Sequence, residues 1–283
     1  MTIKTVGIVG AGTMGNGIAQ VVSAAGLSVV LVDISDEAVN RGIKNVDGNL
    51  GRLVKKEKLS EADKAATLAR IKGTTRYADL APVDLVIEAA TENEALKLRI
   101  LGEISAIVGP EAIIATNTSS ISMTKLAAAT KGSDRFMGMH FFNPVPVMAL
   151  VELIRGLQTS DQTQARIEAF TRAIGKTPVK AKNSPGFIVN RILCPMINEA
   201  VFALQEGLGT AEEIDTGMRL GCNHPIGPLA LADLIGLDTM LSVMEVLYQG
   251  FGDPKYRPAG LLREMVDAGY LGRKTGRGFF NYA

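Results

Sequence analysis

A chain of 283 residues is long enough for two hydrophobic cores, because domains usually run to about 100–200 residues. Its 30 basic and 29 acidic residues leave a net charge of +1, which argues against a nucleic-acid or membrane-surface binder. Cys194 and Cys222 form neither a CxxC pair nor a disulfide framework, so we expect no metal site and interpret both thiols as packing residues. No apolar run approaches the roughly 18 residues that span a bilayer, and the first strand-like run starts almost at the N-terminus. We therefore expect a cytoplasmic protein.

Short apolar runs alternate with helical patterns through the first two-thirds of the chain. This alternation predicts an α/β fold with a doubly wound, Rossmann-type parallel sheet and helices on its faces. The expected strands are Val6–Val9, Val29–Val32, Leu85–Glu88, Ile113–Asn117, Phe136–His140 and Leu150–Ile154.

A long charged stretch, residues 35–72, separates the second and third runs. Its apolar positions recur at helical spacing, and Leu59-Ser60-Glu61 resembles a turn in which Ser60 caps a second helix. The stretch therefore predicts a helical hairpin that protrudes from the first domain.

The pattern changes near residue 183. Asn183-Ser184-Pro185-Gly186 offers a capping serine and a first-turn proline ahead of an apolar helix that reaches about Gln205. The segments 212–220, 228–248 and 259–268 also have helical patterns, broken by Gly and Pro. We expect a dinucleotide-binding domain over residues 1–183 and an all-helical C-terminal domain over residues 184–283.

A glycine-rich turn follows the first expected strand. In Gly10-Ala11-Gly12-Thr13-Met14-Gly15, Gly10 suits the tight turn, Gly12 lets the backbone approach a pyrophosphate, and Gly15 permits close packing of helix and strand. The helix N-terminus that follows favours phosphate charge. Such a glycine pattern alone would fit an ordinary turn equally well, but strand, turn and helix occur here in the required order. The turn predicts dinucleotide binding.

Asp33 ends the second expected strand, about 20 residues further on, where a carboxylate accepts the ribose 2′-hydroxyl. It would repel a 2′-phosphate, and Ile34 supplies no cation for one, which favours NAD over NADP. The alternative role for Asp33 is to cap the next helix, for which Ser35 and Asp36 compete.

Only two histidines, His140 and His224, could act as a base near neutral pH. His140 ends an expected strand, and the carboxyl ends of strands face the cofactor crevice in a doubly wound sheet. A histidine at this position could also be a hydrogen-bonded packing residue. His224 precedes Pro225 in a loop rich in Gly and Pro, which favours a structural role.

Four separate blocks, in order, resemble the L-3-hydroxyacyl-CoA dehydrogenase family, and the resemblance covers nearly the whole chain. They are Thr118-Ser119-Ser120, Met139-His140-Phe141-Phe142-Asn143-Pro144-Val145-Pro146, Leu150-Val151-Glu152 and Ser184-Pro185-Gly186-Phe187-Ile188-Val189-Asn190-Arg191. The similarity continues through Gly221-Cys222-Asn223-His224-Pro225-Ile226-Gly227-Pro228 and Gly276-Arg277-Gly278-Phe279-Phe280.

The resemblance implies reversible, NAD-dependent oxidation of an (S)-3-hydroxyacyl-CoA to the 3-ketoacyl-CoA. We expect a short-chain substrate such as 3-hydroxybutyryl-CoA. The resemblance also implies that His140 is the general base, that Glu152 is its partner, and that Ser119 and Asn190 hold the substrate oxygens. Further nicotinamide-nucleotide contacts are implied for Glu92, Lys97, Asn143 and Lys274. The assignment is chemically coherent, since a base must remove the hydroxyl proton as hydride leaves the same carbon. Glu152 lies on the next expected strand, so strand pairing would bring it beside His140.

Lys55, Lys56 and Lys58 lie at the tip of the expected hairpin, where a run of charges is ordinarily a solvated face. The family places this hairpin over the adenine end of coenzyme A, which singles out Lys56 as a phosphate contact. The family also pairs subunits through its helical domain, which fits the apolar region 228–246 as a homodimer interface.

Two rival functions remain. A 3-hydroxyacid dehydrogenase of a neighbouring family would share the glycine-rich turn but would use a lysine as base, and the blocks around His140 and Glu152 argue against it. A non-catalytic NAD-binding protein derived from such enzymes is disfavoured by the intact set of Ser119, His140, Glu152 and Asn190.

Overall fold

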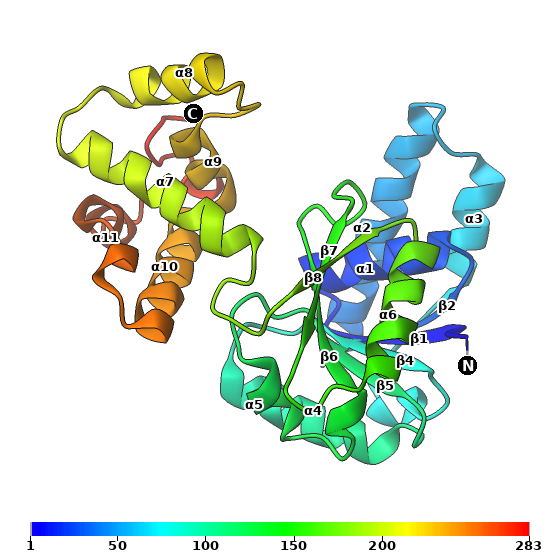
Figure 1. Cartoon of the computed structure of the whole chain (residues 1–283). Helices are drawn as coiled ribbons and strands as arrows, with labels where there is room; N and C mark the ends of the chain where they lie inside the picture. The colour runs from blue at the N-terminus through cyan, green and yellow to red at the C-terminus, as the bar shows by residue number, and fades with distance from the viewer. Residues whose placement is uncertain (1, 283) are drawn as a thin grey trace. The chain divides into compact units, whose positions relative to one another are not determined.

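A computed structural model describes residues 2–282 of the chain. The chain divides into two compact units, Met1–Asn183 and Ser184–Ala283 (Figure 1). The first is an α/β unit and the second is helical. The α/β fold class and the helical character of the C-terminal part, both predicted from the sequence, are confirmed. Within residues 2–282, no helix is both long and apolar enough to cross a membrane.

The first unit is built on one eight-stranded sheet in the order β3-β2-β1-β4-β5-β6-β7-β8. All six expected strands are present, to within one residue at each end. The strands are β1 (Thr5–Val9), β2 (Ser28–Val32), β3 (Ile71–Thr74), β4 (Leu85–Glu88), β5 (Ile113–Thr116), β6 (Phe136–Phe141), β7 (Leu150–Arg155) and β8 (Thr177–Ala181). Strands β1 to β6 run parallel to one another, as expected, but β7 runs antiparallel to β6 and parallel to β8. The expected parallel arrangement therefore holds through β6 and not for β7.

Apolar strands and amphipathic helices form the core of this unit. Val6, Ile8, Leu31, Ile87 and Ile113 are fully buried in the sheet. The helices between the strands are α1 (Thr13–Ala24), α2 (Asp36–Lys55), α3 (Glu61–Ala69), α4 (Glu94–Ile107), α5 (Met123–Ala127) and α6 (Asp161–Ala173). Single turns of 3-10 helix occur at η1 (Tyr77–Leu80) and η2 (Ser133–Arg135).

Helices α2 and α3 form the expected hairpin, which extends away from the sheet (Figure 1). Ser60 caps α3 by accepting a hydrogen bond from the backbone N–H of Asp63, as predicted. The hairpin ends at Ala69, and Ile71 already begins the edge strand β3. No apolar strand pattern marks this segment, because an edge strand buries little and β3 has Lys and Gly between Ile and Thr.

The second unit contains α7 (Val189–Gln205), α8 (Ala211–Gly221), α9 (Pro228–Ile235), α10 (Leu237–Phe251) and α11 (Gly260–Asp267), with 3-10 turns η3 (Pro254–Tyr256) and η4 (Arg273–Thr275). Its core includes Ile197, Leu229, Met240, Met244 and Leu247. Most of the apolar side chains expected to form an interface in region 228–246 therefore pack inside the unit. Leu234 is the exception, with 54% of its surface exposed.

One expectation about these helices was wrong. Helix α7 starts at Val189, not at the Ser184-Pro185 signature, because Gly186 and Phe187 have φ of 72° and 49°, which right-handed helix excludes. The segment 228–248 is broken into α9 and α10 at Gly236, which has φ 101°, in line with the helices broken by Gly and Pro that the sequence predicts. The prediction that α7 reaches Gln205 is confirmed.

Candidate active site

The glycine-rich turn leaves strand β1 and enters helix α1 with the geometry expected for it. Gly10 has φ 103°, and a Cβ there would lie 2.6 Å from the carbonyl oxygen of Ala89. A Cβ on Gly15 would lie 1.7 Å from the Gly10 carbonyl oxygen, so only glycine lets helix and strand pack this closely. A Cβ on Gly12 would meet nothing within 4 Å, and Gly12 caps α1 with no side-chain hydrogen bond. The open space before the helix N-terminus fits an anionic pyrophosphate.

Asp33 lies beside this turn and faces the same pocket. Its carboxylate accepts hydrogen bonds from the backbone N–H of Ala11 at 2.6 Å and of Ile34 at 2.7 Å. Ser35, not Asp33, caps helix α2, which settles the alternative left open by the sequence. Asp33 therefore places a negative charge at the pocket, whereas the neighbouring Ile34 is 93% exposed and offers no cation.

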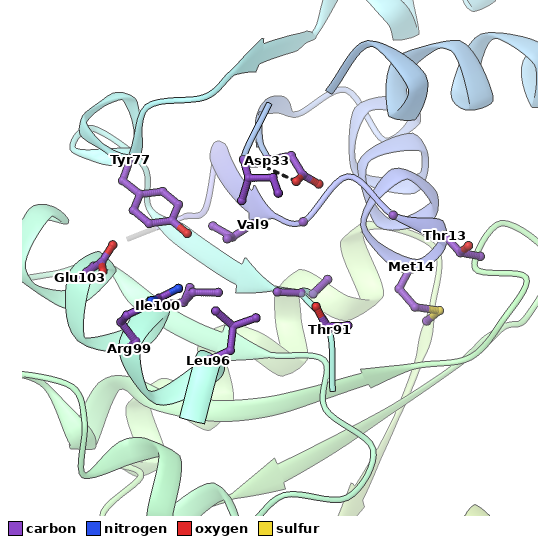
Figure 2. A pocket seen from close by; sticks show the side chains of 15 residues that line it. Val9, Thr13, Met14, Asp33, Tyr77, Thr91, Leu96, Arg99, Ile100 and Glu103 are labelled. Carbon is purple, nitrogen blue, oxygen red and sulfur yellow. Dashed lines mark hydrogen bonds between the residues drawn. The ribbon is translucent and has the colours of Figure 1, made fainter. Parts of the chain in front are cut away.

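The pocket at the turn has a volume of about 510 Å³ (Figure 2). One wall comes from the turn and from Asp33, and the opposite wall comes from the segment after β4 and from one face of α4, with Leu96, Arg99 and Glu103. Tyr77 closes one end, and burial raises the pKa of its hydroxyl, which keeps it protonated and able to donate. An apolar cavity with a few polar groups at its edge suits a nucleoside.

His140 and Glu152 face each other across the antiparallel pair β6 and β7. They occupy directly opposed positions in the register, and His140 Nδ1 lies 2.8 Å from Glu152 Oε2. Both side chains are buried, with Glu152 fully so. The predicted proximity of the two residues through strand pairing is thus confirmed. The carboxylate favours the tautomer with a proton on Nδ1, which leaves Nε2 as the basic nitrogen.

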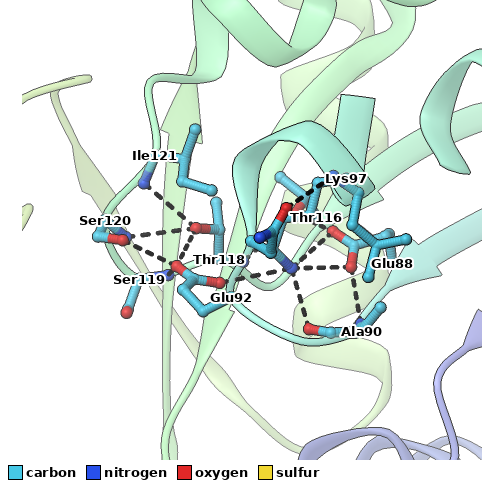
Figure 3. A network of polar contacts seen from close by, with 11 residues as sticks. Glu88, Ala90, Glu92, Lys97, Thr116, Thr118, Ser119, Ser120 and Ile121 are labelled. Atoms are coloured by element: carbon cyan, nitrogen blue, oxygen red, sulfur yellow. Dashed lines mark hydrogen bonds and ion pairs between the residues drawn. The ribbon is translucent and has the colours of Figure 1, made fainter. Parts of the chain in front are cut away.

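The Glu92 carboxylate contacts both Lys97 and the loop that carries Ser119. One carboxylate oxygen accepts hydrogen bonds from Thr118 Oγ1, from the backbone N–H of Ser119 at 3.1 Å and from Ser120 Oγ at 2.8 Å (Figure 3). The hydroxyl of Ser119 points away from Glu92 in this view. The loop is therefore held by the backbone N–H of Ser119 and the hydroxyls of Thr118 and Ser120, and the Ser119 side chain is directed away from Glu92.

Lys97 occupies a more buried position than a direct nucleotide contact requires. Its side chain is 1% exposed, and its Nζ lies 2.8 Å from Glu88 Oε1 and 3.4 Å from Glu92 Oε2. It also donates to the Ala90 carbonyl oxygen at 3.1 Å. The nucleotide contact implied for Lys97 stays a prediction.

Asn143 and Lys56 lie on exposed surfaces of the first unit. Asn143 precedes Pro144 in a cis peptide bond and lines a polar pocket with Thr13, Lys44 and Arg52. Lys56 is the C-cap of α2 and is exposed at the tip of the hairpin. Both placements leave the side chains accessible to a ligand.

The remaining predicted residues belong to the second unit. Asn190 is the second residue of α7, and its side chain is half-buried. Lys274 donates two hydrogen bonds of 2.6 Å to the Asp238 carboxylate, so its cation is already paired within the unit. The roles implied for both residues stay predictions.

Several residues that organise the site escaped the sequence analysis. Glu88 holds Lys97, and Asn117 Oδ1 accepts from the backbone N–H of Phe141 at 2.9 Å, next to His140. Thr118 bridges Glu92 to its own loop. A signal was available for Glu88, since a carboxylate that closes an otherwise apolar strand needs a buried partner.

The two thiols differ. Cys194 is buried, and burial raises its pKa to about 12, which fits the expected packing role. Cys222 is exposed, so the interpretation of both cysteines as packing residues was wrong for this one. It follows α8 as the C-cap residue, where the chain leaves the helix at the surface.

Family models account for almost the whole chain. Residues 5–184 match the NAD binding domain of 3-hydroxyacyl-CoA dehydrogenase, and residues 186–282 match its C-terminal domain. The chain belongs to the 3-hydroxyacyl-CoA dehydrogenase family. It is an NAD-dependent oxidoreductase, and the open turn at Gly12 with the Asp33 carboxylate fits that cofactor.

Relatives extend the family assignment over the full length. A 3-hydroxybutyryl-CoA dehydrogenase of Bradyrhizobium diazoefficiens is 53% identical over 99% of this chain and 96% of its own. The crystal structure of (S)-3-hydroxybutyryl-CoA dehydrogenase from Ralstonia eutropha covers 100% of both chains at 70% identity, with a TM-score of 0.97. The structure of Mycobacterium tuberculosis FadB2 covers 100% of both chains at 42% identity, with a TM-score of 0.98.

Proposed function

We propose that this 3-hydroxyacyl-CoA dehydrogenase acts on (S)-3-hydroxybutyryl-CoA and interconverts it with acetoacetyl-CoA. The opposed pair His140 and Glu152, 2.8 Å apart and buried, carries the proposal because it is a base with its tautomer fixed. The names of the full-length relatives from Bradyrhizobium and Ralstonia support the short acyl chain.

In the oxidative direction, His140 Nε2 takes the proton of the carbon-3 hydroxyl. Glu152 holds the Nδ1–H and stabilises the positive ring that results. When bound, NAD supplies the acceptor for the hydride that leaves the same carbon. The turn from Gly10 to Gly15 and the N-terminus of α1 would hold the pyrophosphate, and Asp33 would accept the ribose hydroxyl.

The two structural units have separate tasks in this proposal. The first unit, with its α2–α3 hairpin, binds NAD and supplies Ser119 and His140. Lys56 on the hairpin provides a cation for a phosphate of coenzyme A. The helical unit supplies Asn190 for the substrate oxygen and pairs two subunits, which is supported by its exposed apolar side chains, Ile192 (66%), Leu208 (80%), Leu220 (80%) and Leu234 (54%).

The deciding experiment follows loss of NADH with acetoacetyl-CoA, with longer 3-ketoacyl-CoAs, and in reverse with free 3-hydroxybutyrate and NAD. We expect acetoacetyl-CoA to give the highest kcat/KM and the free acid to be nearly inert. Comparable turnover of the free acid would favour a 3-hydroxyacid dehydrogenase. NADH binding without turnover of any thioester would favour a non-catalytic NAD-binding protein.

A further inference from the structure

Glu88 and Lys97 form a charged pair buried completely within the first unit. Glu88 is the last residue of β4 and Lys97 lies on α4; their side chains are 0% and 1% exposed. Lys97 Nζ contacts both carboxylate oxygens, at 2.8 and 3.0 Å. Burial of two charges is costly, and well-packed apolar residues at the same positions are often as stable or more so. Stability alone is therefore a weak reason for this pair.

Glu88 and Lys97 also form hydrogen bonds with the segment that follows β4, residues 89–91. Glu88 Oε1 accepts from the backbone N–H of Ala90 at 2.7 Å, and Lys97 donates to the carbonyl oxygen of Ala90 at 3.1 Å. Ala90 is thereby held at both ends. This segment lines the nucleotide pocket and lies against the glycine-rich turn, since a Cβ on Gly10 would lie 3.0 Å from Ala90 N.

The same pair reaches the Ser119 loop by two routes (Figure 3). Lys97 contacts Glu92, whose carboxylate accepts from the Ser119 N–H. Glu88 Oε2 accepts from Thr116 Oγ1 at 2.6 Å, and this hydroxyl accepts from the backbone N–H of Thr118 at 3.3 Å. A displacement of Glu88 would thus move the nucleotide wall and the loop together.

We propose that Glu88 is a positioning residue that, through Lys97 and Thr116, sets the nucleotide-pocket wall and the Ser119 loop in one common geometry. The inference rests on the proposed function for its catalytic part and on the family's NAD binding for the rest. Misplacement of reacting groups by about 1 Å can cost about 10²-fold in rate, so a residue that touches no ligand can control turnover.

The test separates positioning from folding by removal of the whole pair. Glu88→Gln replaces the nearest carboxylate of Lys97 with a neutral amide and leaves only that of Glu92 at 3.4 Å, so it should lower Tm, weaken NADH binding at least tenfold and lower kcat. The double variant Glu88→Leu/Lys97→Met removes both charges, so we expect it to regain most of the wild-type Tm but to keep the weakened NADH Kd and the lowered kcat. Recovery of Tm, NADH Kd and kcat together would overturn the proposal.

Glu94→Gln is the matched control, because Glu94 begins the same helix and pairs with Lys125 at 2.6 Å on the exposed surface. Its NADH Kd and kcat should stay within about twofold of wild type, as expected for an exposed ion pair. NADH Kd is measured by fluorescence titration and does not depend on the acyl substrate. If wild type fails to reduce acetoacetyl-CoA, the proposed function fails, while the NADH titrations still test Glu88.

A milder substitution tests the same link should the pair variants not fold. Thr116→Val keeps the shape of the side chain but removes the hydroxyl between Glu88 and Thr118, so kcat should fall about tenfold. Tm should fall less than in Glu88→Gln, because Glu88 Oε2 keeps its contact with Lys97. Thr116→Ser should restore kcat. A Thr116→Val enzyme with wild-type kcat would show that Glu88 does not hold the Ser119 loop, and would overturn the proposal.

Discussion

The pairing of His140 with Glu152 makes a quantitative prediction about two substitutions. Removal of a general base costs about 10²–10⁴-fold in kcat, or about 2.7–5.4 kcal/mol of barrier, and we expect this loss for His140→Ala. The 2.8 Å contact to His140 Nδ1 places an amide in Glu152→Gln against the same nitrogen. An amide N–H directed at Nδ1 moves the ring proton to Nε2, which abolishes its basicity. Glu152→Gln should therefore lose most of the same factor.

The double variant distinguishes one functional unit from two independent groups. With His140 absent, Glu152 has no tautomer to fix, so His140→Ala/Glu152→Gln should be little slower than His140→Ala alone. The assay is kcat for acetoacetyl-CoA reduction at saturating NADH, with NADH Kd measured for each variant to show that the pocket is intact. Losses that multiply while NADH Kd stays constant would refute the reasoning.

The other histidine provides the matched control. His224 lies in the second unit, is half-buried, and has a backbone N–H that bonds to the Met218 carbonyl oxygen at 3.3 Å. Its side chain has no part in the proposed proton transfer. His224→Gln should keep kcat within about twofold of wild type, because the substitution changes no group that takes part in the proposed proton transfer.

Three further outcomes are expected. Asp33→Ala should reduce the ratio of kcat/KM for NAD over NADP by about 10–100-fold, the usual value of a charged hydrogen bond, and an unchanged ratio would exclude Asp33 as the selector. Lys56→Ala should raise the KM for acetoacetyl-CoA about two- to fivefold with kcat unchanged, and this KM should depend less on salt than in wild type. A pantetheine thioester of acetoacetate lacks the nucleotide, so its KM should be the same for Lys56→Ala and wild type. Burial lowers the pKa of Lys176 from its ordinary 10.5. Between the lowered pKa and 10.5, the unfolded state therefore binds more protons than the folded state. The contribution of Lys176 to the free energy of unfolding should rise with pH across that window. Denaturant titrations of Lys176→Met should lack that rise.

The sequence was most informative where strands are buried on both faces. The runs at β1, β2, β4 and β5 are almost wholly apolar, as parallel central strands must be, and their positions were predicted within one residue. The edge strands β3 and β8 have sequences IKGT and TPVKA, in which solvent exposure removes the apolar signal. Their existence depends on pairing with β2 and β7, which no local pattern encodes.

Predictions from local sequence preference failed where the backbone adopts a conformation that the preference does not indicate. Ser184-Pro185 is a sound helix start by local preference, but the positive φ of Gly186 and Phe187 delays α7 to Val189. The role of Glu88 depends on Lys97, nine positions further on and on a different element, and on Thr116 from a third. Periodicity within one helix or strand cannot reveal such a cluster, because its members share no common face.

The antiparallel turn into β7 brings Glu152 beside His140, and the sequence of the connection explains why β7 is antiparallel. Parallel strands need a crossover of a dozen or more residues, usually helical. The connection from β6 to β7, residues 142–149, is shorter than that and contains Pro144 and Pro146, which oppose a helix. The chain must therefore return antiparallel, and Lys176 holds this connection through the carbonyl oxygens of Val145 and Met148 at 2.6 and 2.7 Å. A tight return from the end of β6 sets Glu152 opposite His140, so the proposed base and its carboxylate come from one strand reversal at the edge where the parallel strands end.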